Sequence, residues 1–154
     1  LRWRGPALPH DLRAPRQAQQ GRVELCKRHH PRTLAGVDAV CPTAPETKMW
    51  VQSPPRVIEN ILVGHEASAN VLVNTRSISV PGITVSVREM VDSLRRVAGE
   101  AVAARVTWQL DPAIDRLVSS WPQAFSAQRG RSLGMTADAN FDEIVRAYIA
   151  STSA

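Results

Sequence analysis

The sequence predicts one mixed α/β domain that begins near residue 34. From Leu34 onward, short segments with strand-like alternation of apolar residues are interspersed with segments whose apolar residues recur at helical spacing. Turn residues separate these segments, and their order contains no repeat. A chain of 154 residues, 44% of them hydrophobic, can bury one core of modest size.

Two strands and a helix are predicted first. Residues 37–41 form a short apolar run that ends at Pro42, and residues 48–52 form a second strand candidate. Ser53 can cap a helix that starts with two prolines, because the first N–H groups of a helix have no partner within it. Apolar residues at helical spacing then continue to Gly64, which predicts a helix of about three turns.

The clearest local signal is a capping box at Ser86 and Glu89. The serine hydroxyl can accept a hydrogen bond from the N–H of Glu89, and the glutamate carboxylate can accept one from the N–H of Ser86. An apolar stripe behind the box predicts a helix that ends near Gly99. The stripe consists of Val87, Met90, Val91, Leu94, Val97 and Ala98.

The remaining segments complete the α/β pattern. Strands are predicted at residues 77–80 and 83–85, on either side of the turn Pro81–Gly82, and at residues 106–110. A short turn is predicted at residues 101–104. Helices are predicted over residues 112–118, 127–133 and 141–149.

The positive charge of the chain is concentrated in its first 33 residues. Residues 1–33 hold eight of the 19 basic and two of the 14 acidic residues, a net charge of +6. The rest holds 19 − 8 = 11 basic and 14 − 2 = 12 acidic residues, a net charge of −1. Because residues 1–33 lack apolar periodicity, we expect a disordered basic segment followed by a domain over residues 34–154.

The basic segment leaves one alternative open, a small nucleic-acid-binding module that uses residues 1–33. Basic side chains neutralise phosphates, but only Trp3 offers a stacking surface there, and the neutral remainder argues against a nucleic-acid partner. No apolar run reaches the ~20 residues that cross a bilayer, and no signal peptide is recognisable. Two cysteines are too few for a disulfide framework. These features predict a cytoplasmic protein without a membrane partner.

Motifs for catalysis and cofactor binding are absent from the sequence. It contains no Gly-x-Gly-x-x-Gly fingerprint and no P-loop. Tyr148 is the only tyrosine, and Thr152 stands where a Tyr-x-x-x-Lys pair requires lysine. We therefore expect no catalytic residue in this chain.

One set of residues has the chemistry of zinc ligands. The set is Cys26, His29, His30 and Cys41. Its spacing is poor, because adjacent histidines rarely reach the same ion and Cys41 belongs to a predicted strand. An exposed basic stretch and a core cysteine explain the residues better, so we predict no metal site.

Lys48 and Trp50 are candidates for ligand contact. Trp50 stands near the end of a predicted strand and shortly before a helix, where α/β proteins bind ligands. Lys48, two residues earlier, points to the same side of the strand. A cation and a ring together suit an anionic or sugar-like ligand. The alternative is that Trp50 packs in or beside the core, as most tryptophans do.

A series of short segments carries a family resemblance. The segments are LAGVDAVCP (34–42), MW (49–50), SP (53–54), VIEN (57–60), VPGITVS (80–86), DPAI (111–114), SWP (120–122), LGM (133–135) and FDEIVRAYI (141–149). In this order they resemble the C-terminal part of extended short-chain dehydrogenases of the NAD-dependent epimerase/dehydratase family. The resemblance covers residues 34–154.

The resemblance implies a function. Family members carry an NAD-binding Rossmann domain and a small substrate-capping domain, and they oxidise a sugar hydroxyl by hydride transfer to NAD. The resemblance places this chain in the substrate-binding portion, with the Rossmann core largely missing. Lys48, Trp50 and Ser53 match the segment that contacts nucleotide or substrate. We therefore predict a fragment of an NAD-dependent sugar-acid dehydrogenase that is inactive alone and takes a small sugar acid as substrate.

Two departures from the family qualify this picture. Gly130 and Arg131 replace small helix-forming residues, and a glycine inside a helix costs about 1 kcal/mol relative to alanine.

Read one base later, with free choice of synonymous codons, residues 13–32 become VRPGKPNKAASSFASGIIRE, which resembles the family segment before Leu34. We hypothesise a shifted frame, which the coding DNA tests.

Where a missing domain would pack, we expect exposed apolar surface and self-association into a homo-oligomer.

Overall fold

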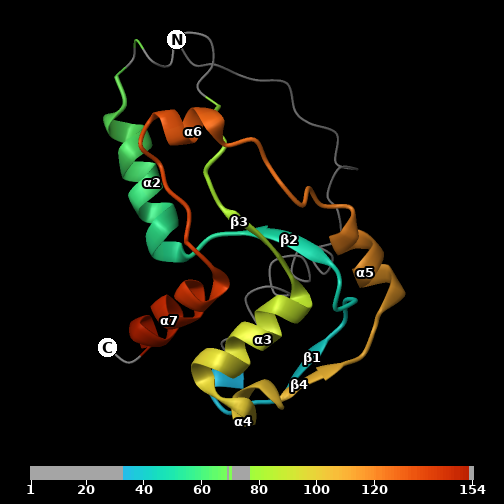
Figure 1. Ribbon diagram of the computed structural model, residues 1–154. Coiled ribbons are helices and arrows are strands. Elements are labelled where there is room, and N and C mark those ends of the chain that lie inside the picture. Colours follow the sequence, from blue (N-terminus) through green and yellow to red (C-terminus); the bar gives the residue numbers. More distant parts are fainter. Residues whose placement is uncertain (1–32, 69, 71–76, 153–154) are drawn as a thin grey trace, which may run out of the picture.

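The fold is seen in a computed structural model of the chain, which describes residues 33–68, 70 and 77–152. Its elements are β1 (Ala39–Cys41), β2 (Lys48–Val51), α2 (Pro54–Glu66), β3 (Ile83–Ser86), α3 (Val87–Ala98), α4 (Glu100–Ala103), β4 (Val106–Trp108), α5 (Pro112–Ser119), α6 (Gln128–Ser132) and α7 (Phe141–Thr152). This order confirms the predicted mixed α/β class (Figure 1). Residues 1–32 of the segment expected to be disordered, and with them the expected shifted frame, lie outside the described residues, whereas Thr33 is described and buried.

The strands form two separate pairs. β1 and β4 run parallel, with Cys41 opposite Trp108. β2 and β3 run antiparallel, with Trp50 opposite Thr84. β4 ends at Trp108, earlier than the predicted residue 110, because its partner β1 ends at the opposite residue.

The strand predicted at residues 77–80 is wrong. These residues have no regular secondary structure, and β3 pairs with β2 instead of forming a hairpin across Pro81–Gly82. They lie against α6, where a Cβ atom added to Gly130 would come within 2.6 Å of the backbone oxygen of Ser79. Packing against a helix therefore prevails over the alternating pattern of the sequence.

The predicted capping box forms at the start of α3. The N–H of Ser86 donates to the Glu89 carboxylate over 2.7 Å, and the N–H of Glu89 donates to Ser86 Oγ over 3.2 Å. The helix ends at Ala98, before Gly99, whose φ of 93° favours glycine. The core that α3 helps to form contains Cys41, Met49, Val85, Val87, Met90 and Val118.

A polar cluster joins α3 to α7, which lie side by side (Figure 1). The Asp142 carboxylate accepts hydrogen bonds from the Ser93 hydroxyl over 2.5 Å and from Arg96 Nη2 over 2.7 Å. The hydrogen bond from Arg96, followed by that from Ser93, lowers the pKa of Asp142 to about 2. The carboxylate is therefore charged at neutral pH and fixes the first turn of α7 on α3.

Helix ends differ from the predictions by up to three residues. α2 continues past Gly64 to Glu66, and α7 continues past residue 149 to Thr152. Gly64 does not end its helix. It lies against the side chain of Met135, whose Cε would be 3.1 Å from an added Cβ atom. Close packing, and not a change of backbone direction, accounts for this glycine.

The outer face of α2 is apolar and exposed. Ile58, Ile61 and Leu62 stand three and four residues apart, so they share one face, and their exposed fractions are 60%, 60% and 55%. This is apolar surface of the kind expected where a further domain would pack. No helix in the described part of the chain is long and apolar enough to cross a bilayer.

Candidate functional site

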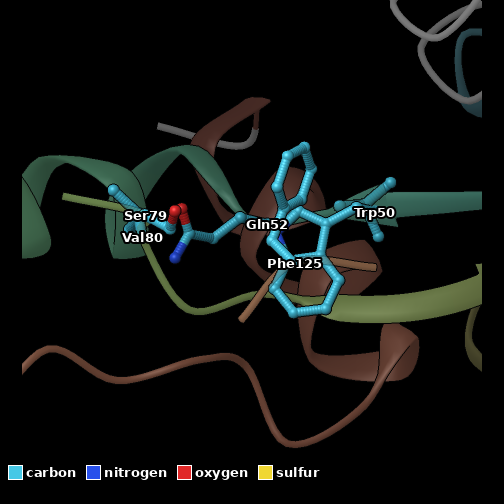
Figure 2. Close-up of a pocket in the computed structure, with 6 residues that line it drawn as sticks. Trp50, Gln52, Ser79, Val80 and Phe125 are labelled. Carbon is cyan, nitrogen blue, oxygen red and sulfur yellow. The ribbon is translucent and has the colours of Figure 1, made fainter. Parts of the chain in front are cut away.

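A pocket of about 330 Å³ lies at the end of β2. Its lining consists of Trp50, Val51, Gln52, Ser79, Val80 and Phe125, and we call it the Trp50 pocket (Figure 2). The lining comes from β2 and the residues after it, from the segment before β3, and from the loop between α5 and α6. Segments far apart in the sequence thus form one site.

Two aromatic rings form a corner of the Trp50 pocket. The ring centroids of Trp50 and Phe125 are 5.9 Å apart, and the rings are inclined by 70°. Gly82 lies beside the indole, where an added Cβ atom would be 2.7 Å from Trp50 Nε1, so glycine permits this position of the ring. The Thr84 hydroxyl donates to the backbone oxygen of Gln123 over 2.7 Å and so holds the loop that carries Phe125.

Gln52 is oriented by a single contact. Its side-chain Nε2 donates to the backbone oxygen of Pro81. Because a carbonyl oxygen can only accept, this contact fixes which end of the amide is nitrogen. The amide oxygen of Gln52 therefore points away from Pro81.

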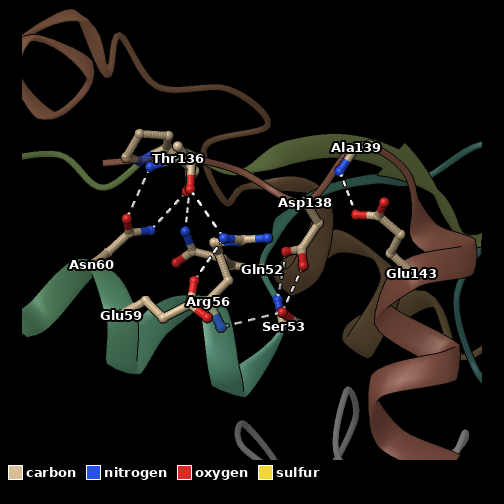
Figure 3. A network of polar contacts seen from close by, with 10 residues as sticks. Gln52, Ser53, Arg56, Glu59, Asn60, Thr136, Asp138, Ala139 and Glu143 are labelled. Atoms are coloured by element: carbon tan, nitrogen blue, oxygen red, sulfur yellow. Dashed lines mark hydrogen bonds and ion pairs between the residues drawn. The ribbon is translucent and has the colours of Figure 1, made fainter. Parts of the chain in front are cut away.

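Ser53 lies next to the pocket, but its hydroxyl is occupied. The backbone N–H of Ser53 donates to Asp138 over 2.8 Å, and its hydroxyl donates to the same carboxylate over 2.6 Å (Figure 3). The Ser53 oxygen also accepts from the N–H of Arg56 over 3.4 Å, as a helix cap does. Ser53 and Asp138 are both buried. The geometry of Ser53 is that of a residue that positions the start of α2.

A second clamp holds the middle of α2. Asn60 is buried at 1% exposure and makes a reciprocal pair with the backbone of Thr136. Its Nδ2 donates to the Thr136 oxygen over 2.8 Å, and its Oδ1 accepts from the Thr136 N–H over 2.9 Å (Figure 3). The segment before α7 is thus tied to α2 at two places, which fixes the elements around the pocket.

Lys48 does not line the Trp50 pocket. It is exposed at the start of β2, two residues before Trp50. Its positive charge acts on Glu89, whose pKa is lowered mainly by the hydrogen bond from the Ser86 backbone, next by that from the Ser86 hydroxyl, and less by Lys48. Of the three predicted contact residues, the structure therefore places Trp50 in the pocket lining, Ser53 next to the pocket, and Lys48 beside the α3 capping box.

Three residues of the site were not predicted, and each is the partner of a predicted one. Gln52 and Phe125 line the pocket with Trp50, and Asp138 holds Ser53. A faint signal existed for Gln52, which follows Lys48 and Trp50 on the same side of the strand. No local pattern marks Phe125 or Asp138, because their roles depend on contacts across more than seventy residues.

The described residues do not fit a dinucleotide. A dinucleotide site needs a glycine-rich turn between a strand and a helix, where the backbone approaches the phosphates. The three strand-to-helix junctions of the described chain are capped instead by Ser53, Ser86 and Asp111. We therefore assign no cofactor contact to these residues.

Of the four residues with zinc-ligand chemistry, one lies in the described part of the chain. Cys26, His29 and His30 lie outside the described residues. Cys41 is buried, and its sulfur lies 3.5 Å from the hydroxyl oxygen of Thr43. Among the residues that are described, no three His, Cys, Asp or Glu side chains form a group that could hold a metal ion.

Comparison with curated proteins identifies two related dehydrogenases. Over 116 residues the chain is 44% identical to D-erythronate dehydrogenase of Cupriavidus necator, which covers 75% of this chain and 36% of the relative. The chain matches part of an extended short-chain dehydrogenase. D-erythronate dehydrogenase of Haemophilus influenzae is 32% identical over 116 residues, 75% of this chain and 37% of the relative. The predicted resemblance is confirmed, and the chain spans little more than a third of the length of these relatives.

Solved structures agree with this assignment. The nucleoside-diphosphate-sugar epimerase of Agrobacterium tumefaciens superposes with a TM-score of 0.73 at 31% identity, over 77% of this chain and 34% of the epimerase. L-threonine 3-dehydrogenase of Trypanosoma brucei superposes with a TM-score of 0.67 over 79% of this chain and 37% of that enzyme, and its 19% identity supports the fold alone. No protein-family model matches the chain.

Proposed function

We propose that this chain supplies the substrate-covering part of an NAD-dependent sugar-acid dehydrogenase similar to D-erythronate dehydrogenase, and that it is inactive alone. One observation carries the proposal: the Trp50 pocket is formed by a chain that is 44% identical to such an enzyme over three quarters of its length. The proposed substrate is a small sugar acid. The proposed compartment is the cytoplasm, where a chain with two cysteines has no need of disulfides.

The three predicted contact residues have different tasks in this proposal. Trp50 offers a ring to the substrate. Ser53 acts as a positioning residue, because its buried contact with Asp138 fixes the start of α2. Lys48 lies on the same face of β2 as Trp50, about 7 Å along the strand. It supplies a positive charge beside the pocket.

The proposal assigns cofactor binding and proton abstraction to polypeptide outside this sequence. The Gly-rich loop and the tyrosine–lysine pair of the family have no counterpart among these residues. The described residues can bind and orient a substrate. Fixing the reacting group in this way can supply a large part of a rate enhancement.

A complementation experiment tests the proposal. The full chain is mixed with, or fused to, the part of the Cupriavidus necator enzyme that precedes the matched region, and D-erythronate-dependent formation of NADH is followed. We expect activity with both parts, none with either part alone, and a strong loss in Trp50→Ala. The matching C-terminal part of the Cupriavidus enzyme is the positive control. Turnover by the chain alone, or rescue by the control part only, would refute the proposal.

The rival function is nucleic-acid binding by the basic segment. The observation in its favour is the net charge of +6 in residues 1–33. Retention of the full chain on a nucleic-acid column that falls steeply with salt, and is lost when residues 1–32 are removed, would support this rival.

A further inference from the structure

We infer that the Trp50 pocket binds the neutral, hydroxylated carbon chain of its ligand, and not a carboxylate or a phosphate. The inference deepens the proposed function, on which it rests for the choice of a four-carbon sugar acid as ligand. It assigns the two ends of such a ligand to different surroundings. The hydroxyl-bearing carbons enter the pocket, and the carboxylate stays outside it.

The uncharged lining of the pocket disfavours an anion. None of the six lining residues carries a formal charge. Moving an anion out of water without pairing it with a cation is strongly unfavourable. Lys48 is not part of the lining, and the negative charge of Glu89 lies close to it. The pocket therefore discriminates against the charged end of a sugar acid.

The hydrogen-bonding groups of the pocket favour a hydroxylated ligand. The indole Nε1–H of Trp50 has no acceptor within the described residues, and Gln52 Oε1 has no donor there, since Nε2 makes the contact with Pro81. Neither atom is sealed from solvent, because Arg56 Nε is the one buried, unpartnered side-chain atom of the described part. The pocket thus presents these two groups together with the hydroxyl of Ser79, which can both donate and accept.

A hydroxyl group suits this pair better than a carboxylate does. A hydroxyl can accept from Trp50 Nε1–H and donate to Gln52 Oε1, whereas an ionised carboxylate can only accept. An ionised carboxylate therefore leaves the Gln52 oxygen without a donor. A pair of neighbouring hydroxyls can use both groups without this cost.

The aromatic corner of the pocket favours C–H groups over an anion. The face of an aromatic ring is negative, so it attracts the slightly positive C–H groups of a polyol and repels an anion. Trp50 and Phe125, inclined by 70°, offer two such surfaces at an angle (Figure 2). The volume of about 330 Å³ is near the lower end of the range for small-molecule sites, about 300–1,000 Å³. A short carbon chain fits these dimensions.

Nuclear magnetic resonance of the tryptophan indole N–H signals tests the inference on the full 154-residue chain. Three probes are titrated: erythritol, a neutral four-carbon polyol; D-erythronate; and butyrate, a four-carbon carboxylate without hydroxyls. Trp50→Phe identifies the Trp50 signal. We expect erythritol and D-erythronate to shift that signal with dissociation constants within about threefold of each other, and butyrate to leave it unchanged.

Two other tryptophans serve as controls in this titration. Trp108 is exposed and lies outside the pocket lining, so its signal should stay in place with all three probes. Trp121 packs against the core, and its signal reports that each variant is folded. Gln52→Leu should weaken erythritol binding about threefold to tenfold, the effect of one lost hydrogen bond.

Three results would overturn the inference. These are a shift of the Trp50 signal by butyrate as large as that by erythritol, no shift by erythritol up to its solubility limit, or equal shifts of the Trp50 and Trp108 signals. Loss of NADH formation in the complementation experiment with erythritol binding intact would refute the proposed function alone. Activity without erythritol binding would refute this inference alone.

Discussion

Helices α2 and α3 have almost the same length but opposite surroundings. α3 buries Leu94 at 1% exposure and packs against α7. α2 buries only Asn60, and its apolar residues Ile61 and Leu62 face outward. α3 is held by apolar burial together with the contacts of Ser93 and Arg96 with Asp142, whereas α2 is held mainly by hydrogen bonds of buried polar groups.

The difference separates two uses of an amphipathic helix. In α3 the apolar stripe has its partner within this chain, so the helix supplies stability. In α2 the contacts of Ser53 with Asp138 and of Asn60 with Thr136 fix the helix, and its apolar face is exposed. Variants of the two helices can break or sharpen this comparison.

The largest effect is expected from the same substitution made on both helices. Leu94→Ala removes a fully buried side chain and should lower the free energy of unfolding by about 2–5 kcal/mol, since it leaves a cavity. Leu62→Ala removes a side chain that is 55% exposed and should change it by less than about 0.5 kcal/mol. Urea unfolding followed by circular dichroism measures both values. Equal losses would show that α2 is packed as tightly as α3.

A smaller effect is expected from two glycines inside helices. Gly130→Ala places a Cβ atom 2.6 Å from the backbone oxygen of Ser79, which cannot move as a side chain can. We expect a loss of about 1–3 kcal/mol in spite of the better helix propensity of alanine. Gly64→Ala meets only the flexible end of Met135, at 3.1 Å, and should be neutral or stabilise by up to about 1 kcal/mol. A stabilised Gly130→Ala protein in thermal unfolding would contradict the packing of α6 on Ser79.

These glycines show what the sequence could and could not predict of the fold. The capping box at Ser86 and Glu89 depends on residues three apart, and it was predicted correctly with its helix. Gly130 looked like a cost within a helix, because its reason lies about fifty residues away in the chain, at Ser79. The strand wrongly predicted at residues 77–80 has the same cause, since these residues pack against α6, which is distant in the sequence. Features set by neighbouring residues were predicted correctly, and features that depend on packing between distant segments were not.

The candidate site divides in the same way. Trp50 was predicted from its place at the end of a strand, and it lines the pocket. Whether Lys48, Trp50 and Ser53 contact a ligand stays a prediction. Ser53 was also expected as a helix cap, and this role is confirmed, but its buried partner Asp138 is 85 residues away and no pattern announces it. Phe125, which completes the aromatic corner, comes from a loop whose position depends on the fold.

The α3–α7 contact predicts a defined response to acid. The pKa of Asp142 is lowered from 3.8 to about 2, so the folded state binds its proton less readily than the unfolded chain. The stabilisation is therefore complete above about pH 4 and is lost as the pH falls towards 2. Asp142→Asn should cost about 1–2 kcal/mol at neutral pH, and its difference from the unchanged chain should shrink in that window.

Urea unfolding at several pH values measures this difference. Glu89 and Glu46 also have lowered pKa values, through the hydrogen bonds from Ser86 and from Arg88. They act equally in both proteins and cancel in the comparison. A difference that stays constant from neutral pH to pH 2 would show that the charge of Asp142 does not contribute.

The smallest effect on stability, and the sharpest test of the comparison, is expected at Ile61. Ile61→Glu places a charge on the exposed face of α2, where water can solvate it, so the free energy of unfolding should change by less than about 0.5 kcal/mol. If this apolar face drives self-association of the isolated chain, the same variant should lower the average mass in sedimentation equilibrium. Glu59→Gln, on the same helix but outside the apolar stripe, is the control and should leave the mass unchanged. Self-association that survives Ile61→Glu would assign it to another surface, and a large loss of stability would show that Ile61 is covered within the chain.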